Sequence, residues 1–258
     1  MTRPTSRRVL VTGASRGIGR AVAQAFAAQG DTVAVHYASS PGDAEQTLAS
    51  LAGDGHVLLQ ADVGDPDAAR RLVEDVVEAL GGVDVLVNNA AVAPGTANRH
   101  RIGEVGYEAW QTTWRRMIDV DLLGAANVTY CVADHLIGRG VPGSIVNVGS
   151  RGAFRGEPDF PAYGAAKAAL HAFGQSMAVA LAPHDISVTS VAPGFVATER
   201  QLEKLDGPAG DELRAQSPHG RVGTAEEVAA AVVYLASPAA AWSTGAVLDV
   251  NGASYLRT

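Results

Sequence analysis

Three polar side chains near the middle of this 258-residue chain have the types and spacing that proton transfer requires. Tyr163 and Lys167 are four residues apart in an alanine-rich segment after Pro161, so on a helix they lie one turn apart on the same face. Ser150 follows GSIVNVG, an apolar run that predicts a buried strand ending at the serine. An ammonium beside a tyrosine lowers its pKa, ordinarily about 10, and makes the phenol a usable proton donor or acceptor. The stretch therefore predicts an acid–base site.

Composition and charge narrow the class of protein. With 47% hydrophobic and 18% charged residues, the chain suits one large α/β domain with a full core. The net charge of -7 comes from interspersed acidic and basic residues, which argues against a nucleic-acid partner. Residues 1–7 form a short polar tail rather than a signal peptide, and no stretch reaches the ~18 apolar residues of a membrane span. We therefore expect a cytoplasmic protein without a membrane partner.

Cysteine and histidine offer little for metal or redox chemistry. The single cysteine, Cys131, rules out an intrachain disulfide framework and a thiolate zinc cluster, and we interpret it as a core residue rather than a reactive thiol. The seven histidines show no HExxH or similar ligand spacing. We therefore predict no metal site.

The first elements of the chain predict a nucleotide site. A β-branched run at 9–12 predicts a strand, and residues 20–29 predict a helix. Between them lie Gly13, Ala14, Ser15, Arg16, Gly17, Ile18 and Gly19. Glycines let a backbone approach a pyrophosphate, which the free N–H groups and positive end of the following helix bind. A glycine-rich turn alone is weak evidence, but the strand and helix beside this one favour nucleotide binding.

The second predicted strand, Thr32 to Tyr37, indicates which nicotinamide cofactor is used. An acid at its end would accept a hydrogen bond from a ribose 2′-hydroxyl, whereas a 2′-phosphate needs donors and cations. This strand ends without an acid, at Tyr37 followed by Ala38, Ser39 and Ser40, and Arg16 lies in the nearby glycine loop. The pattern favours NADP(H) over NAD(H). We interpret His36 as structural or packed near the adenine rather than catalytic.

Strands and helices alternate along the rest of the chain. Strands are predicted at 56–60, 83–87, 144–148, 186–191 and 246–250, and helices at 66–80, 110–137, 162–181 and from the capped Thr224. This alternation predicts an α/β fold, a single-domain, doubly wound parallel sheet spanning 1–258. Ligands bind such sheets at the carboxyl ends of the strands, where Asp62, Asn89 and Ala90 lie. We assign Asp62 to the nucleotide in preference to a cap of the helix near Pro66.

Two irregular segments and one helix have further predicted roles. Residues 93–109 predict a surface loop that shapes substrate access, and the charged residues 199–220 have the composition of a mobile lid. The helix at 162–181 is apolar on most faces, which favours a subunit interface over coverage within one subunit. Ser176 in this helix is not a hydrolase nucleophile, because a nucleophile elbow needs a strand-to-helix turn and a second glycine.

These motifs, in this order, resemble the short-chain dehydrogenase/reductase family of the single-domain Rossmann type, from Val9 to Gly252, and in particular its 3-oxoacyl reductase-like members. The matching residues are Thr12 to Gly19, Asp62-Val63, Asp84 with Asn88-Asn89-Ala90, Ser150, Tyr163 with Lys167, and Pro193-Gly194 with Thr198. The resemblance implies a seven-stranded parallel sheet with helices on both faces. It also implies hydride transfer between a nicotinamide cofactor and a carbonyl or alcohol, in a homotetramer or homodimer.

The resemblance implies a role for each matching residue. Tyr163 would be the general acid in reduction, Ser150 would hydrogen-bond the carbonyl oxygen, and Lys167 would lower the pKa of the tyrosine and hold the nicotinamide ribose. The positive nicotinamide of the oxidised cofactor would lower that pKa further. The remaining cofactor contacts would be Asp62 and Val63 near the adenine, Asn89 and Ala90 in the groove, and Pro193, Gly194, Val196 and Thr198 beside the carboxamide.

One position departs from the family pattern. The family places an asparagine in the long helix before the serine, and its backbone carbonyl holds a water that extends the proton relay from the lysine. Asp121 stands there in this sequence. A backbone role survives, but the carboxylate would raise the pKa of Lys167, or be protonated itself if buried. We expect an active enzyme with an altered pH profile and count Asp121 among the catalytic residues.

The leading hypothesis is an NADPH-dependent reductase of a ketone or a 3-oxoacyl group. The alternative is a protein that senses NADP(H) or binds a partner without turnover, and the intact Ser150, Tyr163 and Lys167 argue against it. Five residues are expected to border the substrate pocket: Arg151, Phe154, Arg155, Phe160 and Phe195. This mixture suits an acidic or thioester-linked substrate, although exposed arginines are usually just solvated.

Overall fold

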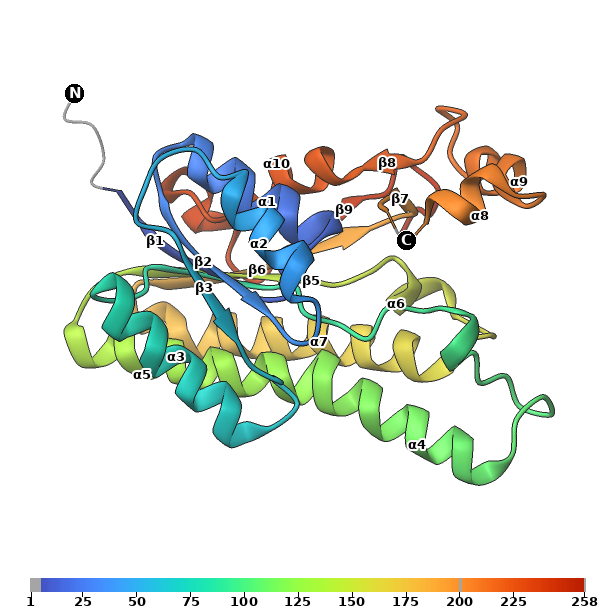
Figure 1. Ribbon diagram of the computed structural model, residues 1–258, viewed down its shortest axis with the longest axis horizontal. Helices are drawn as coiled ribbons and strands as arrows, with labels where there is room; N and C mark the ends of the chain where they lie inside the picture. The colour runs from blue at the N-terminus through green and yellow to red at the C-terminus, as the bar shows by residue number, and fades with distance from the viewer. Residues whose placement is uncertain (1–5, 200, 258) are drawn as a thin grey trace.

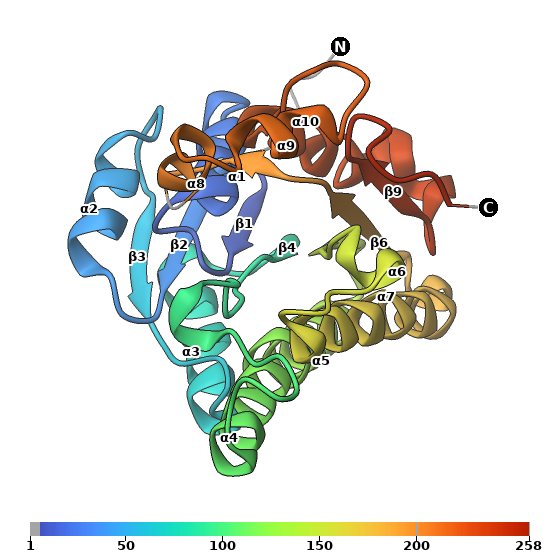
Figure 2. The same ribbon diagram turned by 90° about the vertical axis from the view of Figure 1, so that its right-hand side faces the viewer.

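A seven-stranded parallel sheet forms the centre of the computed structural model, which describes residues 6–199 and 201–257. The strand order is β3-β2-β1-β4-β5-β6-β9 (Figure 2). The direction in which successive strands are added therefore reverses between β1 and β4. The strands are β1 (Arg8–Val11), β2 (Thr32–Tyr37), β3 (Val57–Gln60), β4 (Val85–Asn88), β5 (Gly143–Val148), β6 (Ile186–Pro193) and β9 (Val247–Val250). The predicted doubly wound fold is confirmed. Residues 1–5 of the predicted tail and Arg200 of the predicted lid lie outside the described residues.

Helices cover both faces of this sheet (Figure 1). The helices α1 (Gly17–Ala28) and α10 (Ala225–Leu235) pack on one face, and α3 (Pro66–Leu80), α5 (Ala125–Arg139) and α7 (Pro161–Leu181) on the other. Within β1, Val9 and Val11 belong to the first layer and Leu10 to the second, because successive strand side chains point to opposite faces. Both faces are thus apolar, and the polar site residues are left to the carboxyl ends of the strands.

The ends of two helices follow from capping residues in the sequence. Asp65, not Asp62, caps α3, and its carboxylate accepts a 2.9 Å hydrogen bond from the Ala68 N–H. At α10, Thr224 and Glu227 form the predicted capping box. Asp62 therefore does not cap α3.

The long helix before the site differs from the prediction in two ways. It begins at Tyr107 rather than Trp110, so the preceding loop ends at Gly106. Its first part, α4 (Tyr107–Ile118), continues into a wider π-helical turn at Asp119–Gly124 and then into α5. Gly124 lies against Val63, and a Cβ there would come within 2.9 Å of the Val63 side chain. The widened turn therefore lies where the helix passes the end of β3.

The remaining elements are short. The predicted lid contains two short helices, which are separated by Gly207, Pro208 and Ala209. The short elements are α2 (Pro41–Ala49), η1 (Thr96–Asn98), α6 (Gly152–Arg155), η3 (Ala182–His184), β7 (Val196–Ala197), α8 (Leu202–Asp206), α9 (Gly210–Ala215), β8 (Gly223–Thr224) and η4 (Pro238–Ser243). Among the described helices, none is long and apolar enough to cross a membrane.

Candidate active site

The carboxyl ends of β1 and β4 are joined by a hydrogen-bond network around Thr12 and Asn89. The Thr12 hydroxyl accepts from the backbone N–H groups of Asn89 and Ala90, at 2.9 and 3.0 Å. The Asn89 amide donates in return to the carbonyl oxygens of Thr12 and Gly13, both at 2.9 Å. A Cβ on Gly19 would overlap both the Gly13 carbonyl oxygen and the Asn89 amide. The glycine loop is thus held in one conformation by residues that the sequence assigned to the cofactor.

The amino-terminal end of α1 binds an anionic group within the chain. The Gly17 N–H donates a 3.0 Å hydrogen bond to the Glu199 carboxylate, which also pairs with Arg20 at 3.1 Å. A carboxylate at a helix N-terminus is stabilised by the free N–H groups and the positive end of the dipole. This contact shows that the glycine loop can hold an anion, as a bound pyrophosphate would require. The residues present therefore fit a dinucleotide.

A groove of about 300 Å³ runs along the glycine loop and the ends of β2, β3 and β4. The predicted cofactor residues that line it are Gly13, Ser15, Arg16, Gly17, Ile18, Gly19, Ser39, Ser40, Asp62, Val63, Asn89, Ala90 and Thr198. The predicted residues outside this lining are Tyr37, Tyr163, Lys167, Pro193, Gly194 and Val196. Of these, Pro193, Gly194 and Val196 follow or end β6, toward the lid. The groove therefore matches the predicted adenosine and pyrophosphate positions more fully than the predicted carboxamide positions.

Sequence reasoning missed several residues of the groove. Arg116 and Val120 line it from the long helix, and Glu199 from the start of the lid. Arg116 donates a 2.8 Å hydrogen bond to Asp62, so it holds this carboxylate at the end of β3. Arg116 could have been suspected from the sequence, because it lies five residues before Asp121 in the same predicted helix.

His36 is structural, as the sequence suggested. Its Nδ1 accepts a 3.0 Å hydrogen bond from the Gly13 N–H, and its Nε2 lies 3.0 Å from the Ala61 carbonyl oxygen. A carbonyl oxygen only accepts, so Nε2 carries the proton and the ring is neutral. Burial lowers the pKa of His36 to about 4, which keeps it neutral at physiological pH. The ring ties the glycine loop to the residue after β3.

Ser150, Tyr163 and Lys167 meet at the carboxyl end of β5. Ser150 follows β5, and its side chain is close enough to Tyr163 on α7 to lower the pKa of the phenol. Lys167, one helical turn further on, is buried, and its Nζ lies 5.8 Å from the centre of the Tyr163 ring. It donates a 3.0 Å hydrogen bond to the Val148 carbonyl oxygen, which fixes the ammonium to the strand that delivers Ser150. The structure thus brings the three predicted residues together.

The pKa of Tyr163 differs from the prediction. Burial raises it, the nearby Ser150 side chain lowers it, and the charges of Asp121 and Glu157 raise it again, so the net pKa lies above the ordinary value. The expected lowering of this pKa by Lys167 is not seen, and burial also lowers the pKa of Lys167. In the chain by itself, Tyr163 is a protonated phenol, suited to donating a proton.

Asp121 lies in the widened helical turn and points toward Lys167. Its Oδ1 accepts a 2.7 Å hydrogen bond from the Val92 N–H, and its Oδ2 lies 4.0 Å from Lys167 Nζ. Among the described residues, Oδ2 has no hydrogen-bond partner. Burial raises the pKa of Asp121 to about 6, against the lowering effects of Lys167 and the Val92 N–H. As the sequence suggested, the buried carboxyl holds its proton more tightly than an ordinary aspartate.

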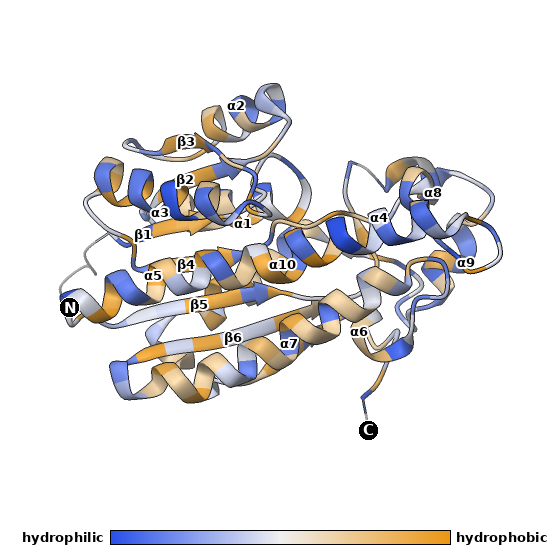
Figure 3. Ribbon diagram, turned by 90° about the horizontal axis from the view of Figure 1, so that it is seen from below, coloured by the Kyte–Doolittle hydropathy of each residue, from blue (hydrophilic) through white to orange (hydrophobic). Residues whose placement is uncertain are grey.

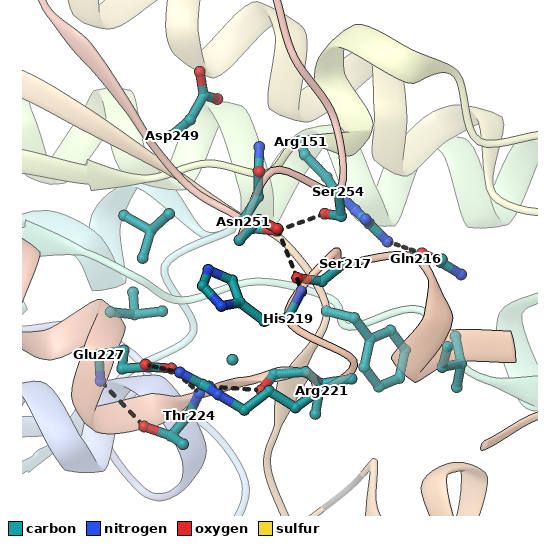
Figure 4. Close-up of a pocket in the computed structure, with 17 residues that line it drawn as sticks. Arg151, Gln216, Ser217, His219, Arg221, Thr224, Glu227, Asp249, Asn251 and Ser254 are labelled. Atoms are coloured by element: carbon teal, nitrogen blue, oxygen red, sulfur yellow. Dashed lines mark hydrogen bonds and ion pairs between the residues drawn. The ribbon is translucent and has the colours of Figure 1, made fainter. Parts of the chain in front are cut away.

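A second cavity, of about 200 Å³, lies beneath the lid near the carboxyl ends of β6 and β9 (Figure 4). Arg151 and Phe195, two of the five predicted substrate-pocket residues, line it. Arg151 is 7% exposed and donates from Nη2 to the side chain of Gln216, which follows α9. Figure 4 shows the two side chains pointing toward one another. Arg151, the residue after Ser150, is therefore linked to the lid.

The other three predicted pocket residues have partners within the chain. Phe154 stacks on His171 at a ring distance of 5.2 Å, and Phe160 meets His100 edge-on at 6.2 Å. Arg155 lies 3.4 Å from Gln216. In the described part of the chain, no group of three or more His, Cys, Asp or Glu side chains is placed to hold a metal ion.

Comparison with known proteins gives consistent matches over the whole chain. A family model described as Enoyl-(Acyl carrier protein) reductase matches residues 13–253. The L-rhamnose 1-dehydrogenase (NAD(P)(+)) of a Sphingomonas strain is 38% identical over 253 residues, 97% of this chain and 96% of that protein. The 3-oxoacyl-[acyl-carrier-protein] reductase of a Synechocystis strain is 36% identical, covering 98% of each. The crystal structure of an acetoin dehydrogenase from Salmonella typhimurium superimposes with a TM-score of 0.81 at 30% identity, over 96% of each chain.

Proposed function

Because the chain belongs to the short-chain dehydrogenase/reductase family of oxidoreductases, we propose that it reduces a ketone or 3-oxoacyl group to an alcohol with NADPH. The observation that carries the proposal is the meeting of Ser150, Tyr163 and Lys167 at the end of β5, beside a glycine loop that holds an anion. A protein that only binds NADP(H) has no need for a buried tyrosine and lysine in this arrangement.

The chain's own residues account for the proton transfer. A nicotinamide cofactor, when bound, supplies the hydride. The Ser150 hydroxyl orients the substrate carbonyl oxygen by a hydrogen bond, and the Tyr163 phenol donates its proton to the same oxygen as the alcohol forms. The raised pKa of Tyr163 keeps the phenol protonated in the resting chain. Lys167, fixed to the Val148 carbonyl oxygen, places a positive charge near the phenolate that this step leaves.

The preference for NADPH rests on the adenosine end of the groove. Arg16, Ser39 and Ser40 all line it, and the end of β2 carries no acid. A 2′-phosphate here would meet one cation and two hydroxyl donors, whereas a 2′-hydroxyl would find no carboxylate at this strand end. Arg16 pairs with Asp43 at 3.2 Å, a bond that the phosphate would compete for.

The relatives' names guide the choice of test substrates. They name L-rhamnose, a 3-oxoacyl group and acetoin, in each of which a second oxygen function lies one or two carbons from a carbinol or carbonyl carbon. We therefore propose a substrate of this oxygen-rich class for the chain. The screen is acetoacetyl-CoA and diacetyl with NADPH or NADH, and L-rhamnose and acetoin with NADP⁺ or NAD⁺, followed by absorbance at the nicotinamide band.

Tyr163→Phe is the decisive variant for this function. It removes the proton donor but keeps the ring, so turnover on the best substrate falls by at least about a thousandfold while NADPH affinity stays within about twofold. Tyr107→Phe, at an exposed tyrosine at the start of α4, is the matched control and keeps full activity. Activity retained in Tyr163→Phe would refute the assignment. Tight NADPH binding without turnover on any compound would favour the sensor alternative.

Self-association and location complete the proposal. An apolar groove runs between α5 and α7, lined mostly by side chains of these helices, among them Tyr130, Ile137 and Met177. Figure 3 shows α7 largely in the hydrophobic colours, and Val179 on it is 80% exposed. These features support a homodimer or homotetramer that covers α5 and α7. The single cysteine supports a reducing compartment such as the cytoplasm.

A further inference from the structure

The loop between β4 and α4 places His100 against the first turn of α7. His100 is 1% exposed, and its Nε2 accepts a 3.0 Å hydrogen bond from the backbone N–H of Ala162. Ala162 is the second residue of α7 and directly precedes Tyr163. The first N–H groups of a helix have no acceptor inside the helix, so an outside group must supply one. Here it comes from a loop about sixty residues away in sequence.

The helix has no cap of its own at this end. Phe160 occupies the N-cap position, and its side chain has no acceptor atom. Pro161 has no N–H to satisfy, and the Gly164 N–H bonds back to the Phe160 carbonyl oxygen at 3.2 Å. The Ala162 N–H is thus the donor that depends on His100. An imidazole takes the place that a serine or aspartate side chain fills in most helices.

The chemistry of the two partners determines the form of the ring. The His100 Nδ1 lies 2.7 Å from the Asn98 carbonyl oxygen, an atom that only accepts, so Nδ1 carries the proton. Nε2 faces an N–H group, which only donates, so it presents its lone pair. His100 is therefore a neutral ring with both nitrogens engaged. A side chain must offer an acceptor at the Nε2 position to replace it.

The loop around His100 is built to hold this ring in place. The Asn98 side chain accepts from the Gly95 N–H and donates to the Ala93 carbonyl oxygen, at 2.8 and 3.0 Å. The His100 N–H donates to the Asp159 carbonyl oxygen at 3.1 Å. The Asp159 carboxylate in turn pairs with Arg99 at 3.0 Å and with Arg101 at 3.7 Å. Loop and helix start are thus joined on both sides of the ring.

Resting on the proposed function, we propose that His100 is a positioning residue for Tyr163, which holds the first turn of the catalytic helix by accepting the Ala162 N–H. Tyr163 depends on this turn because it is the next residue along the chain. The Tyr163 phenol must meet Ser150 on a different element, and small shifts of the helix start separate the two. The residues that line the cofactor groove do not include His100. Loss of the cap therefore affects the proton step and not cofactor binding.

The test compares His100→Ala, His100→Gln and His56→Ala in the full chain. The glutamine amide oxygen reaches the Nε2 position, so His100→Gln keeps an acceptor. His56 is the matched control, because its Nδ1 also accepts from a backbone N–H, that of Val33 at 3.0 Å, at the start of β2. Three quantities are measured for each: hydrogen exchange of the peptide 159–166 in D₂O, the NADPH dissociation constant, and kcat on the best substrate of the screen.

We expect His100→Ala to speed exchange of the peptide 159–166 and to lower kcat about fivefold or more, with NADPH affinity within about twofold. His100→Gln restores most of both, and His56→Ala leaves both as in the unsubstituted chain. A kcat within twofold in His100→Ala, or a folded His100→Gln as slow as the alanine variant, overturns the proposal. If His100→Ala does not fold, His100→Gln against His56→Ala decides. If Tyr163→Phe keeps its activity, the proposed function fails instead, and the exchange of the peptide 159–166 still reports the cap.

Discussion

Asp121 Oδ2 and Lys167 Nζ lie 4.0 Å apart, and their side chains are 0% and 3% exposed. Burial disfavours both charges, since it raises the pKa of Asp121 to about 6 and lowers the pKa of Lys167. Their mutual attraction opposes both shifts. The charge of Asp121 therefore changes near pH 6, beside Lys167, which follows Tyr163 by one helical turn.

Asp121→Asn is expected to shift the pH dependence of the reductive rate. The Asp121 charge raises the pKa of both Tyr163 and Lys167, so its removal lowers both. Reduction needs a protonated Tyr163, and the alkaline fall in kcat therefore moves to lower pH in the variant. The measurement is kcat with saturating NADPH from pH 5 to 10. Asp119→Asn, two residues away on the same turn, is the control, and equal profiles for all three chains would remove Asp121 from the proton transfer.

The same substitution is expected to make the chain relatively more stable as the pH rises, whereas loss of an aspartate from an ordinary salt bridge makes a chain relatively less stable. The folded-state pKa of Asp121 lies above its unfolded value of 3.8, so the folded chain binds the extra proton between about pH 4 and 6. Stability contributed by this group is present below pH 4 and is lost as the pH rises, at a cost of about 3 kcal/mol above pH 6. Relative to the aspartate chain, Asp121→Asn therefore gains stability from pH 4 to pH 7. Urea unfolding at both pH values checks this, and a constant difference would contradict it.

Arg16→Ala tests the cofactor preference. Loss of the one cation of the glycine loop, which lines the groove together with Ser39 and Ser40, is expected to raise the KM for NADPH about tenfold and to leave the KM for NADH within twofold. Asp43→Asn removes the ion-pair partner of Arg16 without removing the cation, so it leaves NADPH binding equal or tighter. Equal effects of Arg16→Ala on the two cofactors would contradict the 2′-phosphate assignment.

Gly19→Ala tests the rigidity of the glycine loop. The new Cβ would overlap the Gly13 carbonyl oxygen and the Asn89 amide, so we expect the chain to lose cofactor binding and about 2 kcal/mol or more of stability. Gly42→Ala, in the first turn of α2, adds a methyl group with nothing within 4 Å and is expected to be neutral or slightly stabilising. Thermal unfolding and NADPH fluorescence titration compare the two. Normal binding in Gly19→Ala would show that the loop can rearrange.

Val179→Asp tests self-association through α7. A carboxylate at this exposed position adds no strain within one chain, but it would be buried in an interface over α5 and α7. We expect the variant to have the mass of a smaller assembly by light scattering after gel filtration. Ile102→Asp, at an exposed residue of the loop before α4, is the control and keeps the original mass. An unchanged mass for Val179→Asp would place the interface elsewhere.

The sheet and the relative position of Tyr163 and Lys167 were predictable because each leaves a local pattern in the sequence. Strand 32–37 was predicted with its observed bounds, since a run of buried β-branched residues has few other conformations available. Tyr163 and Lys167 were placed correctly because a spacing of four on a helix determines their relative position. In these cases, local periodicity is sufficient.

The contacts between distant segments were not predictable. Glu199 binds the N-terminus of α1, and Arg116 holds Asp62, across 182 and 54 residues of sequence. No periodicity or spacing pattern connects such pairs, because the fold alone brings them together. The pKa of Tyr163 was mispredicted for the same reason, since burial is a property of the packed structure and is the largest cause of the raised pKa.

The widened turn at Asp119–Gly124 has a consequence for insertions and deletions in this chain. A π-helical turn amounts to one extra residue in an α-helix, and one residue rotates everything after it by about 100°. With that residue deleted, either Asp121 keeps its place beside Lys167 and α5 turns its apolar side away from the sheet, or α5 stays packed and Asp121 leaves the site. The number of residues in this turn thus links core packing on α5 to the position of Asp121 beside Lys167, and this stretch should tolerate substitutions far better than a change in length.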